Sequence, residues 1–297
     1  MTGYQPWSDY ERAMLLLDCD AGQQFSAHLS DEGATQLWLL LNSFEPQQHG
    51  AWCGLAVAAT ALKALGAIEP PTQTALFEEA LVVQRMTVQR QLNGGLSLDD
   101  LRQLMLRSLQ RHNLSVGVRC VSAANPELLA SSLDADLIEG ASSASRGAGG
   151  GARPDAAAAL RPLLLVNLIR TLGGSTTGHW VLVGGAVRVG GERWVLILDP
   201  AAHKCGPHWL PELQLIACMA TLNVRGEPRG YLALESYPRH SDNGTDSGAP
   251  PRAECGPGRQ QQLGTGIIAR PGAGAARHAH STAESAEAEE EGDFVMV

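Results

Sequence analysis

The sequence predicts an α+β fold in which a helical half is followed by a β-rich half. Two patterns support this prediction. In the first half, apolar residues recur at the 3.6-residue spacing of a helix, most clearly from Leu55 to Leu65. In the second half, short apolar runs bounded by Gly and Pro are typical of strands. With 297 residues, 44% of them hydrophobic, the chain can form one sizeable domain or two small ones.

Helix signals divide the first half into segments. Gly66 and Pro70-Pro71 are typical helix stops, and Ser97 with Asp100 resembles the N-terminal cap of a helix. The helices expected in this half are at 37–41, from Cys53 to Gly66, at about 75–91, from Ser97 across Leu98, Leu101, Leu104 and Met105, and from Asn125 to about Leu137.

Strand signals begin at residues 114–120, where apolar residues alternate with smaller or polar ones. Beyond residue 160 the predicted order is three strands, one helix and a last strand. These elements are expected at Leu163 to Ile169, His179 to Val187, Glu192 to Leu198, Pro211 to about Leu222, and Tyr231 to Leu234.

Two segments lack the side chains that build a core. Between Glu139 and Ala159 the sequence consists mostly of Ala, Ser, Gly and Arg, and beyond about Tyr237 it is dominated by Pro, Gly, Ser and charges. We therefore expect one domain over residues 1–238, with a flexible insertion at about 139–160. A disordered acidic tail is expected at residues 239–297.

The net charge of −9 is concentrated in that tail. Six acidic residues and no Lys or Arg follow Arg277, which leaves about −3 for the rest of the chain. A nearly neutral body has no basic patch for nucleic acid or for anionic lipid, so neither is an expected partner. The sequence leaves the oligomeric state open.

The cysteines and apolar runs bear on the compartment. None of the six cysteines form a CxxC pair, and residues 1–20 lack the pattern of a signal peptide. The longest later apolar run, 160–169, is interrupted by Arg161 and Pro162 and is far too short for a membrane span. These features predict a soluble, cytoplasmic protein.

Cys53 is a candidate nucleophile because it lies at or beside the start of a predicted helix. Unpaired N–H groups and the helix dipole favour an anion there, which can lower the pKa of a thiol. Gln47, six positions upstream, offers an amide that could stabilise the oxyanion formed on attack. The alternative is a structural role, since a single cysteine on a helix is usually buried in the core.

His179 begins one predicted strand and Asp199 ends the next. A two-residue loop at Gly190-Gly191 would place the two side chains on opposite faces of the hairpin. A three-residue loop at 188–190 places them directly opposite each other on one face, and we expect that loop. A carboxylate beside an imidazole fixes its tautomer and stabilises its protonated form.

The order Gln47, Cys53, His179, Asp199 matches the papain-like cysteine enzymes, in which nucleophile and base come from different halves of the domain. Taken singly, His179 could be an interior histidine, and Asp199 a cap before a proline. A soft-metal site formed by His203, Cys205 and His208 is a further alternative, although the spacing matches no known ligand pattern.

The chain also resembles the phytochelatin synthase family over about residues 43–235, apart from the insertion. The motifs that carry this resemblance are Phe44, Gln47 to Ala56, Gly95-Leu96-Ser97, Val166 to Arg170, Gly178-His179-Trp180, Gly184-Gly185, Val195 to Asp199, Lys204, Pro207-His208-Trp209, Ala217, Met219 and Arg229-Gly230-Tyr231.

The resemblance implies a papain-like fold and an enzyme that acts on glutathione. Cys53 would attack the carbonyl that joins cysteine to glycine, with Gln47 at the oxyanion, and His179, oriented by Asp199, would protonate the departing glycine. The γ-glutamylcysteinyl thioester would pass to a second glutathione, making phytochelatins for heavy-metal detoxification. Arg170 and Lys204 are implied to bind the substrate.

No tightly bound cofactor and no metal site of the protein are implied; cadmium or zinc would arrive as thiolates of the substrate or act as activators. The chain departs from the family pattern at His49-Gly50, Ala202, Cys205 and Asn223. Because Ala202 and Asn223 concern the second substrate, two alternatives stay open: a glutathione hydrolase that yields γ-glutamylcysteine and glycine, and a relative that binds thiols or metal without turnover.

Overall fold

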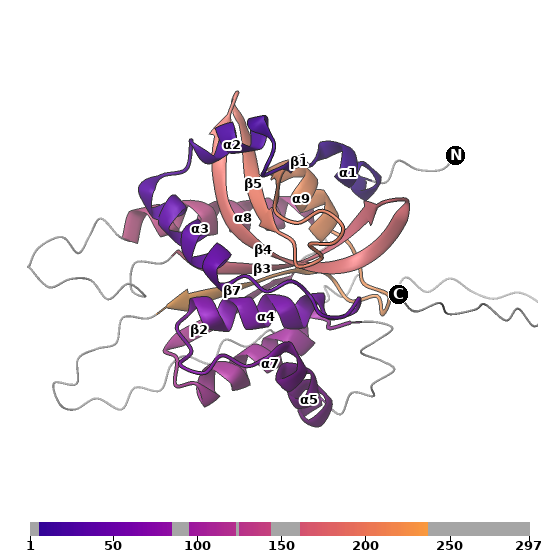
Figure 1. Ribbon diagram of the computed structural model, residues 1–297. Coiled ribbons are helices and arrows are strands. Elements are labelled where there is room, and N and C mark those ends of the chain that lie inside the picture. The colour runs from indigo at the N-terminus through magenta and orange to yellow at the C-terminus, as the bar shows by residue number, and fades with distance from the viewer. Residues whose placement is uncertain (1–5, 85–94, 123–124, 144–160, 237–297) are drawn as a thin grey trace, which may run out of the picture. The chain divides into compact units, whose positions relative to one another are not determined.

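The computed structural model in Figure 1 describes residues 6–84, 95–122, 125–143 and 161–236. All of them belong to one compact unit of the chain, residues 1–254. They form a seven-stranded sheet in which every neighbouring pair is antiparallel, in the order β1-β6-β5-β4-β3-β7-β2. The predicted α+β class is confirmed.

The first half of the chain is mainly helical, as expected. Its elements are η1 (Pro6–Asp9), α1 (Tyr10–Ala13), β1 (Leu15–Leu16), α2 (Asp20–Ser26), α3 (Asp31–Ser43), α4 (Cys53–Ala64), α5 (Gln73–Gln84), α7 (Leu98–Arg111), β2 (Val116–Ser122) and α8 (Pro126–Ser143). The short helix predicted at 37–41 is the end of the longer α3, whose N-terminus is capped by the Ser30 hydroxyl. The predicted cap of α7 is confirmed, because the side chains of Ser97 and Asp100 each accept the other's backbone N–H.

The second half supplies most of the sheet. Its elements are β3 (Leu163–Leu172), β4 (Ser175–Val189), β5 (Glu192–Leu198), β6 (His208–Pro211), α9 (Glu212–Met219) and β7 (Gly230–Ser236). The predicted strands are present, and β6 is an additional one that is too short to give a periodic signal. The remainder of the predicted α5, most of the predicted insertion and the acidic tail fall outside the described residues.

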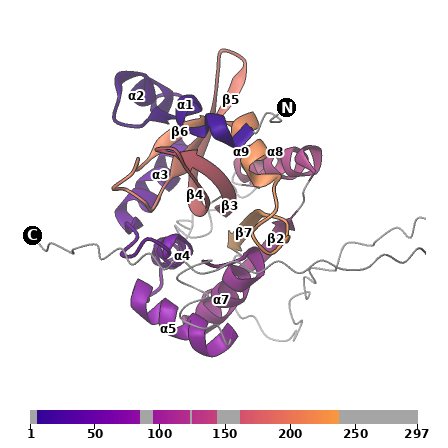
Figure 2. The ribbon, with the colours of Figure 1, turned by 90° about the vertical axis from the view of Figure 1, so that its right-hand side faces the viewer.

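Two hydrophobic cores lie on opposite faces of the sheet. One lies under α3, α4, α5 and α7, and the other under η1, α1, α8 and α9. Figures 1 and 2 show the helices around the sheet. Every residue of α4 except Lys63 is buried. Each fully buried Leu in such a helix contributes about 1.5–3 kcal/mol, so α4 is a firmly held support for Cys53 at its start.

The hairpin between β4 and β5 differs from the prediction. Its turn is the two-residue Gly190-Gly191, with Val189 paired to Glu192. Both glycines have positive φ, 61° and 85°, as a tight hairpin turn of this length requires. The prediction of a three-residue loop at 188–190 is therefore wrong.

A bulge in β4 nevertheless brings the two candidate side chains to one face. The register shifts between Val183 and Gly185, so that β4 contains one extra residue at this point. Since one extra residue exchanges the faces of all side chains beyond it, His179 returns to the face of Asp199. The predicted juxtaposition is correct, although its cause is the bulge and not the turn.

Candidate active site

Cys53 is the first residue of α4, and its thiol is buried. Burial raises the pKa of Cys53, and this effect exceeds the opposing effect of the backbone N–H groups of Trp180, Gly54 and Cys53 itself. The expectation of a lowered pKa at the helix start is corrected accordingly, because the desolvation of a fully buried sulfur outweighs the helix terminus. The resting group is a thiol that needs a base.

The start of α4 packs unusually closely against β4. A Cβ atom on Gly54 would lie 3.1 Å from Trp180 Cδ1 and 3.2 Å from Leu96 Cδ1. The Trp180 indole N–H also donates a 2.8 Å hydrogen bond to the carbonyl of Leu96. The glycine after Cys53 thus allows the nucleophile to approach the strand that carries the base.

His179 is that base candidate, and Asp199 holds it. The imidazole Nε2 lies 2.8 Å from Asp199 Oδ1, and Asp199 has no solvent-exposed surface. Asp199 Oδ1 also accepts the backbone N–H of Ala201 at 2.8 Å. With Nε2 engaged by the carboxylate, the other ring nitrogen, Nδ1, is left to take up a proton.

The pKa of His179 lies well below its usual value. Burial is the largest cause, followed by the positive charge of Arg170 and then of Lys204. The imidazole is therefore neutral at physiological pH and can accept a proton. A neutral thiol beside a neutral imidazole is the resting state that these pKa directions describe.

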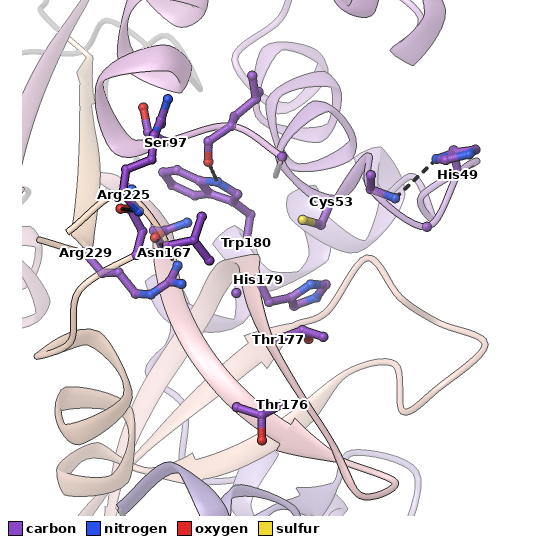
Figure 3. A pocket seen from close by; sticks show the side chains of 17 residues that line it. His49, Cys53, Ser97, Asn167, Thr176, Thr177, His179, Trp180, Arg225 and Arg229 are labelled. Atoms are coloured by element: carbon purple, nitrogen blue, oxygen red, sulfur yellow. Dashed lines mark hydrogen bonds between the residues drawn. The ribbon is translucent and has the colours of Figure 1, made fainter. Parts of the chain in front are cut away.

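One pocket of about 800 Å³ contains both reactive groups (Figure 3). Cys53 forms part of its wall from α4, and His179 with Trp180 forms part from β4. The other residues that line it are His49, Gly50, Ala51, Gly95, Leu96, Ser97, Asn167, Thr176, Thr177, Gly178, Asn223, Val224, Arg225 and Arg229. The structure thus brings the predicted nucleophile and base to one cavity.

The loop before α4 is tied to the end of β5. The Gln47 backbone N–H donates to the Pro200 carbonyl at 2.8 Å, next to Asp199. Gln73, fully buried on α5, donates to the Pro46 carbonyl at 2.9 Å and accepts the Gln48 N–H at 3.0 Å. Sequence reasoning missed Gln73, because nothing local to α5 indicates a partner so far along the chain.

The Gln47 side chain does not line the pocket. Its amide Nε2 donates to the carbonyls of His49 and Gly50, both at 3.1 Å. Both amide hydrogens are therefore in use, and Gln47 can reach an oxyanion only by giving up one of these bonds. Its oxyanion role stays a prediction.

Arg229 is a buried cation in the pocket wall. Arg229 is 5% exposed, and its guanidinium donates to Asn167 Oδ1 at 2.7 Å, while its Nε has no hydrogen-bond partner in the described part of the chain. Within these same residues no carboxylate pairs with it. Burial lowers its pKa and the nearby Cys53 thiol acts in the opposite direction, but an arginine stays charged.

Gly178 makes room for this guanidinium. A Cβ atom there would lie 2.6 Å from Arg229 Nη2. Arg225, also in the pocket wall, is paired with Asp100 and with Glu227, both at 3.1 Å. Arg229 is part of a motif noted in the sequence, but no role was predicted for it. The signal that could have found it is an arginine at the start of a strand.

Comparison with known proteins agrees with this geometry. The family model described as phytochelatin synthase matches residues 11–231, a range that includes Cys53, His179 and Asp199. The chain belongs to the phytochelatin synthase family. A search of curated protein sequences gave no match. In the described residues no helix has the length and hydropathy of a membrane span.

For a phytochelatin synthase family member, the position of Arg170 is unexpected. Arg170 is 2% exposed, does not line the pocket, and forms an ion pair with Asp199 Oδ2. Lys204 is exposed and also lies outside the pocket wall. The substrate-binding roles implied by the family resemblance stay predictions for both residues, and for Arg170 the observed ion pair does not fit that role.

The metal alternative involves a different set of residues than expected. Asp199, Cys205 and His208 each place one donor atom within 4.8 Å of the others, whereas His203 is exposed and outside this group. Hydrogen bonds already account for the arrangement. His208 Nδ1 lies 2.8 Å from the Gly206 carbonyl and its Nε2 lies 2.9 Å from the Tyr10 hydroxyl. The Arg170 guanidinium supplies the positive charge beside the carboxylate.

Proposed function

We propose that the protein is a γ-glutamylcysteinyl transferase that acts on glutathione through a thioester on Cys53 and makes phytochelatins. The observation that carries the proposal is the pocket shared by a buried thiol, an imidazole held by a carboxylate, and a buried arginine that no carboxylate of the described residues pairs with. The first two groups suit acyl transfer. The third suits a small substrate with carboxylates, such as glutathione. Membership in the phytochelatin synthase family supports the same substrate.

The first half-reaction begins with proton transfer. His179 Nδ1 takes the proton of the Cys53 thiol as the sulfur attacks the carbonyl carbon of the cysteine–glycine bond. Backbone N–H groups at the start of α4 would stabilise the resulting oxyanion, and Gln47 is a second donor if it exchanges one of its hydrogen bonds. The imidazolium then donates its proton to the glycine nitrogen, glycine leaves, and the γ-glutamylcysteinyl thioester remains.

In the second half-reaction, the amine of another glutathione attacks the thioester carbonyl. His179 accepts the amine proton, a new amide bond forms, and the Cys53 thiol is regenerated by that proton. Metal ions enter as part of the substrate: cadmium or zinc bound to glutathione thiolates is the proposed acceptor. Water as acceptor gives γ-glutamylcysteine instead.

Arg229 anchors the substrate through both half-reactions. Because glycine departs after the first step, an anchor that must persist has to hold the γ-glutamyl end, and its α-carboxylate is the matching anion. Because no carboxylate of the described residues pairs with Arg229, the substrate does not have to displace one when it binds. Asn167 fixes one edge of the guanidinium, so that the remaining donors are oriented in advance.

Hydrolysis is the second candidate function, and Asn223 favours it. The Asn223 side chain is engaged within its own turn, where it accepts the N–H groups of Arg225 and Glu227 and donates to the Glu227 carboxylate. A residue engaged in this way offers little to a second substrate, which favours water as the acceptor.

The test is a mass-spectrometric product profile from glutathione, with and without cadmium. The transferase proposal expects glycine together with peptides of repeated γ-glutamylcysteine. Dipeptide and glycine without longer peptides would replace it by the hydrolase. If neither product forms, and thioester trapping labels the parent protein no more than Cys53→Ala, the chain is a binding protein without turnover.

A further inference from the structure

Arg170 lies outside the wall of the substrate pocket and pairs with the catalytic carboxylate. It lies on β3 and pairs with Asp199 Oδ2, 3.6 Å from the Cys205 sulfur and with its Cζ 6.0 Å from the centre of the Tyr10 ring. It is 2% exposed. Because it is buried and lies outside the pocket wall, this guanidinium is not placed to touch a substrate.

We infer that Arg170 is a positioning residue, which holds Asp199 ionised and aimed at His179, and is not a ligand of the substrate. This inference rests on the proposed function. It departs from the role that family resemblance implies, and it assigns to Arg170 the control of the acid–base pair that activates Cys53.

The two oxygens of Asp199 have different partners. Oδ1 accepts hydrogen bonds from His179 Nε2 and from the Ala201 N–H, both at 2.8 Å. Oδ2 forms the ion pair with Arg170 and accepts a hydrogen bond from the Cys205 thiol at 3.5 Å. A carboxylate with no exposed surface stays ionised only if a positive charge compensates it. Since His179 is neutral at rest, Arg170 is the group that supplies this charge.

Strand register places Arg170 where it can do this. Leu168 is opposite His179 in the β3–β4 ladder, and Arg170 lies two residues along β3, so the two side chains share a face. Asn167, which contacts Arg229, is opposite Trp180 on the other face. Arg170 therefore lies on the His179 face of the β3–β4 hairpin, whereas Arg229 contacts the opposite face.

Removing the charge of Arg170 has a predictable sign. A neighbouring cation disfavours the imidazolium and favours the thiolate, so its loss makes the His179–Asp199 pair take up a proton at higher pH and makes Cys53 harder to ionise. Both changes move the acid limb of the activity profile to higher pH. The charged and titratable groups around this pair and Cys53 are Tyr10, Arg170, His203, Lys204, Cys205, His208 and Arg229.

The test compares Arg170→Met and Arg170→Lys with Arg193→Met in the full chain. Arg193 is a matched control: it is 8% exposed and ion-paired with Asp134 and Glu212, at the turn end of the hairpin. We expect Arg170→Met to lower kcat about 100-fold with the KM for glutathione changed less than about threefold, and to shift the acid limb upward by about one pH unit. Arg170→Lys should bring the acid limb most of the way back to the pH seen in the parent protein. Arg193→Met should not move it.

A second readout does not depend on turnover. The rate at which iodoacetamide alkylates Cys53, followed by peptide mass mapping against pH, should shift upward in Arg170→Met and not in Arg193→Met. If the parent fails to release glycine from glutathione, the proposed function fails, and this readout still decides the role of Arg170. A raised KM with unchanged kcat, acid limb and alkylation profile would make Arg170 a substrate ligand and overturn the inference.

A double-mutant cycle covers the case in which Arg170→Met folds poorly. In Asp199→Asn there is no anion to compensate, so adding Arg170→Met should change kcat by less than about threefold. If Arg170→Met lowers kcat as much in the Asp199→Asn variant as it does in the protein with Asp199 intact, the positioning role is also rejected.

Discussion

The two buried arginines near the thiol are almost equally hidden, at 2% and 5% exposure, but they have opposite surroundings. Arg170 faces a carboxylate that it neutralises, whereas Arg229 has the neutral amide of Asn167 and no carboxylate among the described residues. A buried charge that is paired with a protein carboxylate supports the catalytic groups, whereas a buried charge without such a pair is available to bind a ligand. The difference separates acid–base control from substrate binding.

The largest expected effect comes from the thiol that both arginines serve. Cys53→Ser should lower glycine release from glutathione by about 10⁴-fold or more, because an alcohol cannot replace the thiol as the nucleophile beside this imidazole. Thermal unfolding should be nearly unchanged, since the substitution is close to isosteric. Glycine release at the parent rate would remove Cys53 from the site. His179→Ala should be similarly inactive, and Asp199→Asn should lose less.

The next effect tests the unpaired arginine. Arg229→Met should lower kcat/KM for glutathione by about 10²-fold, mainly through KM, because the proposed contact with the carboxylate is lost. The acid limb of the profile should move less than in Arg170→Met, because Arg229 interacts with Cys53 but is not among the charges that lower the pKa of His179. Arg225→Met is the control, since Arg225 is already occupied by Asp100 and Glu227. An equal loss in both variants would contradict the distinction between them.

Stability separates the two arginines in a second way. Arg170→Met should lower the free energy of unfolding by about 3–5 kcal/mol, because it leaves Asp199 as a buried, uncompensated anion. Arg229→Met should leave the free energy of unfolding unchanged or raise it, because it removes a buried charge that no carboxylate of the described residues compensates. Urea unfolding of the ligand-free variants measures both. A comparable loss in Arg229→Met would indicate a protein partner for that side chain.

The smallest effect concerns acid stability on the side of Arg170. Burial lowers the pKa of His208 to about 4, with Arg170 acting in the same direction. The unfolded chain therefore binds more protons between pH 6.5 and 4, so the free energy of unfolding falls as the pH decreases through this window, by about 3 kcal/mol. His208→Gln should make unfolding between these pH values less pH-dependent. An unchanged slope would show that His208 is not the responsible group.

Sequence patterns could predict the reactive residues because these residue types carry their chemistry with them. A cysteine at a helix start and a histidine and aspartate at strand ends are visible without a fold. The pKa of Cys53 could not be predicted, because it depends on how completely α4 is buried. Arg229 was missed for a related reason: its partners, Asn167 and Gly178, lie more than 50 positions away in the chain.

The helices and strands were predictable where periodicity is sustained over several turns or residues, as in α4 and α7. The N-terminal η1, α1 and α2 and the short β6 were not, because each has only four to seven residues and no clear periodicity. The burial of Tyr10 and its hydrogen bond with His208 were therefore not predicted. The assignment of a papain-like fold stays a prediction beyond the confirmed α+β class.

The extra residue in β4 has a consequence for anyone who engineers this hairpin. Deleting one amino acid from the bulge between Val183 and Gly185 would restore a regular ladder and rotate the His179 end of the strand by half a turn, away from Asp199. Deleting two consecutive amino acids near the turn would shorten the hairpin but leave each side chain on its original face. Libraries of this region should therefore change the hairpin length only by even numbers.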